Sequence, residues 1–284
     1  MDILEILKSV LFGIVEGITE WLPISSTGHM ILLDEFISLN VSQEFKSVFE
    51  VVIQLGAILA VVIIYWKQIW PFKLNDKSEK GLKSYVKTDI MALWGKILVA
   101  CIPAAVVGIL LDDILEKYLY NYVVVAISLI VFGIAFIVVE NWNKKREAKI
   151  TSISDLTYKV VLIIGVFQLL AAIFPGVSRS GATIVGALLI GVSRTVAADF
   201  TFFLAIPVMA GASLLKLVKF GFAFTANELI VLAVGFVVAF LVSIVVIKFL
   251  LKFIKKHDFK VFGWYRIALG ILVLIYFAVT SMTV

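Results

Sequence analysis

Long apolar runs alternate with short polar segments along the whole chain. Six of these runs are long enough to cross a bilayer as helices of about 20 residues. They lie near residues 47–66, 90–111, 122–140, 195–216, 227–251 and 262–281. The pattern predicts an all-α polytopic membrane protein with about six transmembrane helices.

Two further apolar segments, 3–36 and 158–192, are each interrupted by a polar break. In both, a short apolar helix is followed by a stretch rich in Pro, Gly and Ser and then by a second short apolar stretch. Non-helical backbone is tolerated at membrane depth only where protein or a water-filled cavity surrounds it. We therefore expect two re-entrant helical hairpins inside the bundle.

The two breaks resemble each other, which indicates an internal duplication. The first part of the match has a constant offset of 152 residues, and one residue is added before the second part. The matched pairs are Gly13 with Gly165, Glu16 with Gln168, Pro23 with Pro175, Ser25 with Ser178, Thr27 with Ser180, and Gly28 with Gly181. Each half has three spans and one hairpin, so the second half should insert upside down relative to the first, as an inverted-topology repeat.

We accordingly expect a single integral membrane domain over residues 1–284, with repeat 1 at about 1–141 and repeat 2 at about 158–284. Composition agrees with this class, because 62% of the residues are hydrophobic and 16% are charged, with a mean hydropathy of +1.10. The net charge of +5 comes largely from basic loops near 67–87, 144–149 and 252–260. These loops should face the cytoplasm, so no nucleic-acid partner is needed to explain the charge.

The first break carries two acidic residues with helical spacing. Glu16 and Glu20 are four residues apart, so on a helix they share one face. Two close carboxylates in a low-dielectric site need a shared proton or a cation, and a divalent cation such as Mg²⁺ or Ca²⁺ prefers oxygen ligands. Acidic residues at a helix interface are the alternative interpretation.

The same break ends in the sequence ISSTGH, which contains Ser25, Ser26, Thr27, Gly28 and His29. A serine becomes a nucleophile when a neighbouring base accepts its proton, and His29 follows Ser26 by three residues. We therefore expect Ser26 to attack with His29 as its base. Alternatively, these small polar residues cap a helix that starts at Thr27.

The second break has the composition of an anion site. Arg179 is flanked by Ser178, Ser180 and Gly181, with Thr183 close behind, just before an apolar helix. Backbone N–H groups at a helix start favour an anion, and a guanidinium binds phosphate oxygens in a bidentate manner. The alternative is a buried ion pair between Arg179 and an acidic residue of the first break.

The motifs GIVEGITEWLPISSTGH and PGVSRSGAT, together with the repeated halves, closely resemble the bacterial undecaprenyl-diphosphate phosphatase family historically linked to bacitracin resistance. The resemblance extends over essentially the whole chain. It implies a phosphoric anhydride hydrolase of the bacterial inner membrane. Such an enzyme removes the terminal phosphate from a C55 polyprenyl diphosphate and returns the monophosphate carrier to peptidoglycan synthesis.

The resemblance also implies roles for individual residues. By this similarity, Ser26 would attack, His29 would assist proton transfer, and Arg179 would clamp phosphate. Glu16 and Glu20 would bind the metal and the diphosphate. The supporting substrate contacts would be Ser25, Thr27, Ser178, Ser180, Thr183 and Arg266.

The expected partners are the polyprenyl diphosphate, membrane lipids and a second copy of the chain in a homodimer, with bacitracin competing for the substrate. The site should open toward the outer face of the membrane. An alternative function from a different class is a secondary transporter or lipid flippase with an anion site at the repeat interface. A transporter would not need Ser26 beside His29.

Overall fold

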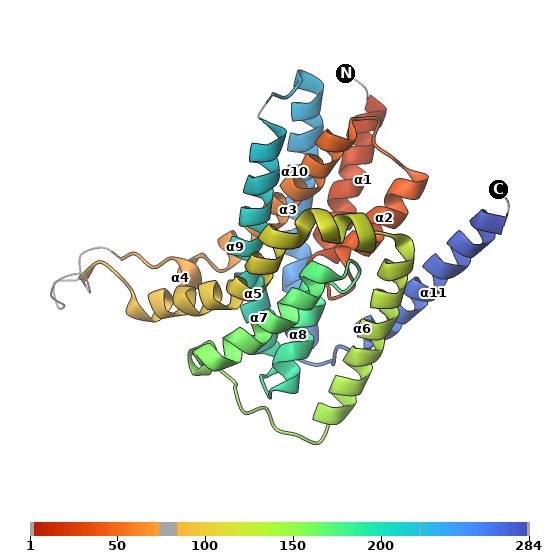
Figure 1. Ribbon diagram of the computed structural model, residues 1–284. Coiled ribbons are helices and arrows are strands. Elements are labelled where there is room, and N and C mark those ends of the chain that lie inside the picture. The colour runs from red at the N-terminus through yellow and green to blue at the C-terminus, as the bar shows by residue number, and fades with distance from the viewer. Residues whose placement is uncertain (1–2, 74–83, 222, 283–284) are drawn as a thin grey trace.

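The computed structural model describes residues 3–73, 84–221 and 223–282. Within these ranges the chain is built from helices and contains no strand longer than an isolated bridge. Part of the first basic loop, residues 74–83, lies outside the described residues. Figure 1 shows the described N- and C-terminal helices ending in the upper part of the view, whereas the loop from α6 to α7 lies at the bottom.

Six helices in the described ranges are long and apolar enough to cross a membrane, which confirms the predicted number of spans and a multi-pass membrane protein. Each overlaps one of the apolar runs found in the sequence. They are α3 (Gln43–Ile64), α5 (Thr88–Leu119), α6 (Tyr122–Asn143), α9 (Arg194–Phe220), α10 (Ala226–Ile254) and α11 (Lys260–Met282).

The two interrupted segments each form a pair of shorter helices. The first pair is α1 (Ile3–Thr19) and α2 (Ser26–Phe36), and the second is α7 (Tyr158–Ile173) and α8 (Arg179–Leu189). Two single-turn elements, α4 (Trp66–Ile69) and η2 (Ile153–Asp155), lie in loops. The order of helix, break and helix is as predicted. The re-entrant placement and the opposite orientation of the two halves stay predictions, because they concern positions relative to a bilayer.

The breaks have the same local geometry, since each ends at a serine that caps the next helix. Ser25 has φ 75° and Ser178 has φ 69°, which puts both residues in the left-handed region. The Ser25 hydroxyl accepts a hydrogen bond from the N–H of Gly28, and the Ser178 hydroxyl accepts one from Gly181. A serine at this position satisfies an N–H that the helix itself leaves without a partner.

Each hairpin packs against a helix of the opposite half. A side chain at Gly13 of α1 would begin 2.7 Å from the carbonyl oxygen of Gly235 in α10, and one at Gly165 of α7 would begin 2.3 Å from that of Ala100 in α5. Small residues allow such close approach between helices. The packing therefore brings the break of each half toward the middle of the bundle.

Candidate functional site

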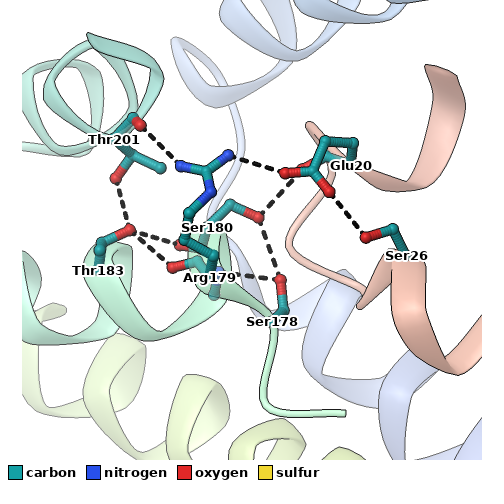
Figure 2. A network of polar contacts seen from close by, with 8 residues as sticks. Glu20, Ser26, Ser178, Arg179, Ser180, Thr183 and Thr201 are labelled. Atoms are coloured by element: carbon teal, nitrogen blue, oxygen red, sulfur yellow. Dashed lines mark hydrogen bonds and ion pairs between the residues drawn. The ribbon is translucent and has the colours of Figure 1, made fainter. Parts of the chain in front are cut away.

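The two breaks meet at the carboxylate of Glu20. The Ser26 hydroxyl donates a hydrogen bond to Oε2 of Glu20 at 2.7 Å, and Nη2 of Arg179 donates to Oε1 at 2.9 Å. Figure 2 shows Ser26 and Arg179 on opposite sides of this carboxylate. The Ser180 hydroxyl also donates to the backbone carbonyl of Glu20 at 3.3 Å. One acidic side chain thus joins a hydroxyl of the first half to a guanidinium of the second.

The guanidinium of Arg179 is held in place but is not fully paired. Its Nη1 donates to the backbone carbonyl of Thr201 at 2.9 Å, and the Thr183 hydroxyl donates to the Arg179 carbonyl, also at 2.9 Å. The hydroxyls of Thr183 and Thr201 are hydrogen-bonded to each other at 2.8 Å. Nε of Arg179 is buried without a hydrogen-bond partner in the described part of the chain. The ion-pair alternative is therefore present, yet it leaves a donor for another ligand.

The remaining small polar residues surround the two helix starts. Ser178 and Ser180 are hydrogen-bonded through their hydroxyls at 3.1 Å. Ser25 is buried at the start of α2, and Thr27 lies half-buried in the first turn of that helix. The positive ends of α2 and α8 thus lie beside the carboxylate network, where they favour an anionic ligand.

His29 is bonded to groups other than Ser26. Its Nδ1 lies 2.7 Å from the Ser25 carbonyl oxygen, and its Nε2 lies 2.7 Å from the Tyr265 hydroxyl. The carbonyl can only accept, so Nδ1 carries the hydrogen and a neutral ring accepts from Tyr265 at Nε2. The predicted pairing of His29 with Ser26 is therefore not observed, and the acceptor for the Ser26 hydroxyl is Glu20.

Tyr265 is a site residue that the sequence did not reveal. Its ring stacks on that of His29, with 2° between the planes and 5.6 Å between the centroids. The two residues are 236 positions apart, and nothing in the apolar pattern of the last span distinguishes this tyrosine from its neighbours. Only tertiary packing brings it to the site.

The phosphate contact predicted for Arg266 stays a prediction, since its Nε is buried without a hydrogen-bond partner in the described part of the chain, while its other guanidinium nitrogens bond to the two breaks. The side chain is fully buried, and its three hydrogen bonds all go to backbone carbonyls: Nη1 to Pro23 at 3.1 Å, and Nη2 to Gly176 and Val177, each at 2.8 Å. Carbonyl groups in a helix break lack intrahelical partners and must be paired when buried. Arg266 therefore links the two breaks and fixes their relative positions.

Glu16 has a buried carboxylate oxygen that is available to a further partner. It is 1% exposed, its Oε1 has no hydrogen-bond partner in the described part of the chain, and the Glu20 N–H bonds to its carbonyl at 3.0 Å. Glu50 of α3, which sequence reasoning missed, is close enough to act electrostatically on it. The matching residue of the second half, Gln168, is also buried, and its side chain has no hydrogen-bond partner in the described part of the chain, so this position carries a charge in the first half only.

This acidic pair fits a cation that takes its other ligands from a substrate. The described residues contain no cluster of three or more His, Cys, Asp or Glu side chains arranged to hold a metal. Mg²⁺ is commonly bound by one or two carboxylates together with phosphate oxygens and water. The unpaired oxygen of Glu16 beside Glu20 meets that requirement.

The site is closed in this structure. The side chains of Glu20 and Arg179 are 8% and 12% exposed. A cavity of about 1010 Å³ lies elsewhere, around Arg194 at the start of α9. A larger ligand would thus reach Glu20 only after the surrounding helices shift.

Comparisons with known proteins give the family that the chain resembles over most of its length. The family model described as "Bacitracin resistance protein BacA" matches residues 9–272. The chain is 61% identical to a protein of Desulfitobacterium hafniense named "Undecaprenyl-diphosphatase", over 99% of both chains. It is 61% identical to an Enterococcus faecalis protein of the same name, over 98% of this chain and 99% of the relative. It is also 62% identical to "Undecaprenyl-diphosphatase 1" of Clostridium acetobutylicum, over 98% of this chain and 100% of the relative.

Proposed function

We propose that this chain, which belongs to the bacitracin resistance protein BacA family, hydrolyses undecaprenyl diphosphate to the monophosphate and inorganic phosphate. The observation that carries the proposal is the Glu20 carboxylate, which accepts hydrogen bonds from both Ser26 and Arg179. It joins a hydroxyl, a carboxylate and a guanidinium in one network, which supports their assignment as nucleophile, proton acceptor and phosphate ligand. Phosphoryl transfer requires little beyond such positioning and charge stabilisation.

In the first step, Ser26 attacks the terminal phosphorus of the diphosphate. Glu20 accepts the hydroxyl proton, an Oγ–P bond forms, and the bond from phosphorus to the bridging oxygen breaks. The leaving group is undecaprenyl monophosphate. In the second step, water attacks the phosphorus of the phosphoserine, the P–Oγ bond breaks, and the proton held by Glu20 returns to Oγ. This releases inorganic phosphate and restores both the Ser26 hydroxyl and the Glu20 carboxylate.

Arg179 stabilises the oxygens of the transferred phosphoryl group. Its buried and unpaired Nε provides a donor at once, and its Nη2 becomes a second donor when phosphate replaces Glu20 as the partner. The Thr201 carbonyl continues to hold Nη1. Release of Glu20 from Arg179 also frees one carboxylate oxygen while the other still accepts from Ser26.

A divalent cation, Mg²⁺ or Ca²⁺, would be held by Glu16 and Glu20. When bound, such an ion neutralises charge on the diphosphate and polarises its phosphoryl oxygens. The unpaired Oε1 of Glu16 supports this assignment. Within the described residues, no hydroxyl donates to Oε1 of Glu16, so we assign Glu16 to binding and orienting the cation.

The cellular setting follows from the family and the charge of the loops. The enzyme acts in the bacterial cytoplasmic (inner) membrane, with its site opening toward the outer face, and recycles the lipid carrier for cell-wall synthesis. Bacitracin competes for the substrate, and membrane lipids and a second copy of the chain are further partners. The basic loops support this orientation through the positive-inside rule.

The test is phosphate release from a polyprenyl diphosphate by the purified protein in detergent, with added Mg²⁺ or with a chelator. Cation-dependent release that is lost in Glu20→Ala and Arg179→Ala would support the proposal and put both breaks in one site. If a folded wild-type protein released no phosphate but moved the lipid across sealed vesicles, the transporter alternative would replace it.

A further inference from the structure

A second polar region lies apart from the two breaks. It is a cavity of about 1010 Å³ formed by the end of α6, the loop after α8, the start of α9 and the end of α10. In Figure 1 the ends of α6 and α8 lie in the lower part of the view, away from the chain termini. Two of the three basic loops, 144–149 and 252–260, contribute to its wall.

The wall of this cavity has an excess of positive charge. Its lining includes four cationic side chains and two acidic ones. Glu140 is almost wholly buried, accepts hydrogen bonds from Nε and Nη2 of Arg194 and from the Phe259 N–H, and so contributes little free charge. The cationic side chains are Arg146, Lys149, Arg194 and Lys255, and the second acidic one is Glu147.

Two other acidic groups lie near the cavity, and each already has another partner: Asp258 forms an ion pair with Lys260, and Asp199 accepts a hydrogen bond from the Tyr65 hydroxyl. The Asp199 carboxylate is close enough to attract Lys255, and the Asp258 carboxylate is close enough to attract Arg194. Arg146 instead packs on the ring of Trp142, 4.2 Å from its centroid. Arg146 and Lys149 are both exposed. These two residues, with Lys255, which is also exposed, therefore provide accessible positive charge at the rim.

The start of α9 adds backbone donors to the same wall. Ser193 caps the helix by accepting from the N–H of Val196. The N–H groups of the first two helical residues, Arg194 and Thr195, have no acceptor within the helix because of their position. Both residues line the cavity, and the positive end of a 27-residue helix favours an anion there.

The surroundings of the cavity are those of a membrane interface. Trp142, near the end of α6, is 55% exposed, and tryptophan is enriched where a bilayer meets water. Leu189, which lines the cavity, is 42% exposed, and Val138 one turn before Trp142 is 56% exposed. A ligand could thus place a charged group among the cations and an aliphatic chain along this apolar surface.

We propose that this cavity binds the phosphate group of an anionic lipid, with Arg146 and Lys149 as its principal side-chain contacts and the start of α9 as a backbone contact. Basic pockets between transmembrane helices on the cytoplasmic side are suited to lipid phosphates. The volume is too large for a phosphate ion alone and accommodates a headgroup with the upper part of its chains. The lipid is either an anionic phospholipid or a polyprenyl monophosphate, which share a phosphate and an aliphatic tail.

The test measures lipid retained by the purified full-length protein in detergent, using native mass spectrometry. The probes are phosphatidylglycerol, phosphatidylcholine with the same acyl chains, and undecaprenyl monophosphate, each with and without excess inorganic phosphate. The variant R146Q/K149Q removes two cations that line the cavity. The matched control is K144Q/K145Q, which makes the same change of charge in the same loop at residues that do not line it.

For an anionic lipid held in the cavity, we expect R146Q/K149Q to weaken binding by about thirtyfold, or about fivefold for each cation removed. The control should bind like the wild type, and phosphatidylcholine should not be retained. If R146Q/K149Q retains less phosphatidylglycerol than the wild type, the lipid is a phospholipid. If it retains less of the monophosphate alone, the lipid is a polyprenyl phosphate. Equal losses in both variants, or full displacement by inorganic phosphate, would overturn the proposal.

Phosphate release provides an independent check that the variants are folded. The four substituted residues lie outside the network around Glu20, so both variants should hydrolyse a polyprenyl diphosphate at the wild-type rate. This result also separates the two proposals, since the lipid site can fail while hydrolysis persists, and hydrolysis can fail while lipid is retained.

Discussion

Replacing Glu20 by glutamine tests the central feature of the site. The two carboxylate oxygens of Glu20 each accept one hydrogen bond, from Ser26 at 2.7 Å and from Arg179 at 2.9 Å. Glutamine has one acceptor oxygen and an NH₂ group that only donates. One of the two donors would then face another donor, and the Ser26 hydroxyl would lose a charged proton acceptor.

The size of the effect follows from the role of the carboxylate. A positioned general base contributes about 10²- to 10⁴-fold to a rate, which corresponds to about 2.7–5.4 kcal/mol of barrier. We expect Glu20→Gln to lower kcat by at least about a hundredfold. Ser26→Ala should cause a similar loss, because the base has no function without its nucleophile.

The decisive measurement is the double variant, assayed by phosphate release under saturating cation. If Glu20 acts through Ser26, the combined substitution should be no slower than the worse single one, since residues that act as a unit are not additive. Glu35→Gln, the same chemical change on the exposed side of α2, should leave the rate unaltered. Fully multiplicative losses in the double variant would show that the two residues act independently, and the proton-transfer role of Glu20 would be abandoned.

Three further changes test other parts of the structure. Tyr265→Phe removes the hydroxyl bonded to His29 and should slow phosphate release by about three- to tenfold, the usual worth of one neutral hydrogen bond; an unchanged rate would remove Tyr265 from the site. Glu16→Gln should raise the cation concentration needed for half-maximal rate by about tenfold or more, and an unaltered cation dependence would rule it out as a ligand. Gly56→Ala puts a methyl group 2.3 Å from the Phe236 carbonyl oxygen and should destabilise the fold by about 1–3 kcal/mol, measured by thermal unfolding. The control Gly211→Ala, which has open space around it, should not destabilise the fold. Equal melting temperatures of the two variants would contradict the close packing of α3 and α10.

Much of the architecture could be predicted because it depends on local properties of the sequence. Hydropathy alone located the six long helices, since each must supply enough apolar residues to cross a bilayer. The prolines and serines of the breaks marked where helical hydrogen bonding stops. The meeting of Glu20 with Arg179 followed from the expected proximity of two duplicated breaks.

The contacts that the sequence did not predict are ones that only tertiary packing creates. The spacing of Ser26 and His29 suggested a pair, but α2 begins at Ser26 and directs His29 toward Ser25 and Tyr265. The turn before α2 instead folds back and places Glu20 beside Ser26. Arg266 has the charge expected of a phosphate ligand, yet it also pairs buried carbonyls of both breaks. Neither outcome has a periodic signal in the sequence.

The left-handed conformation of Ser25 and Ser178 has a consequence for how the site works over time. A residue with a side chain adopts positive φ at a cost of about 1–2 kcal/mol, and here two serines do so at matching places. That cost is met once, when the chain folds, and is not repeated with each substrate. The N-terminal N–H groups of α2 and α8 are thus oriented before a ligand binds, and each reaction cycle starts from the same backbone conformation at these two serines.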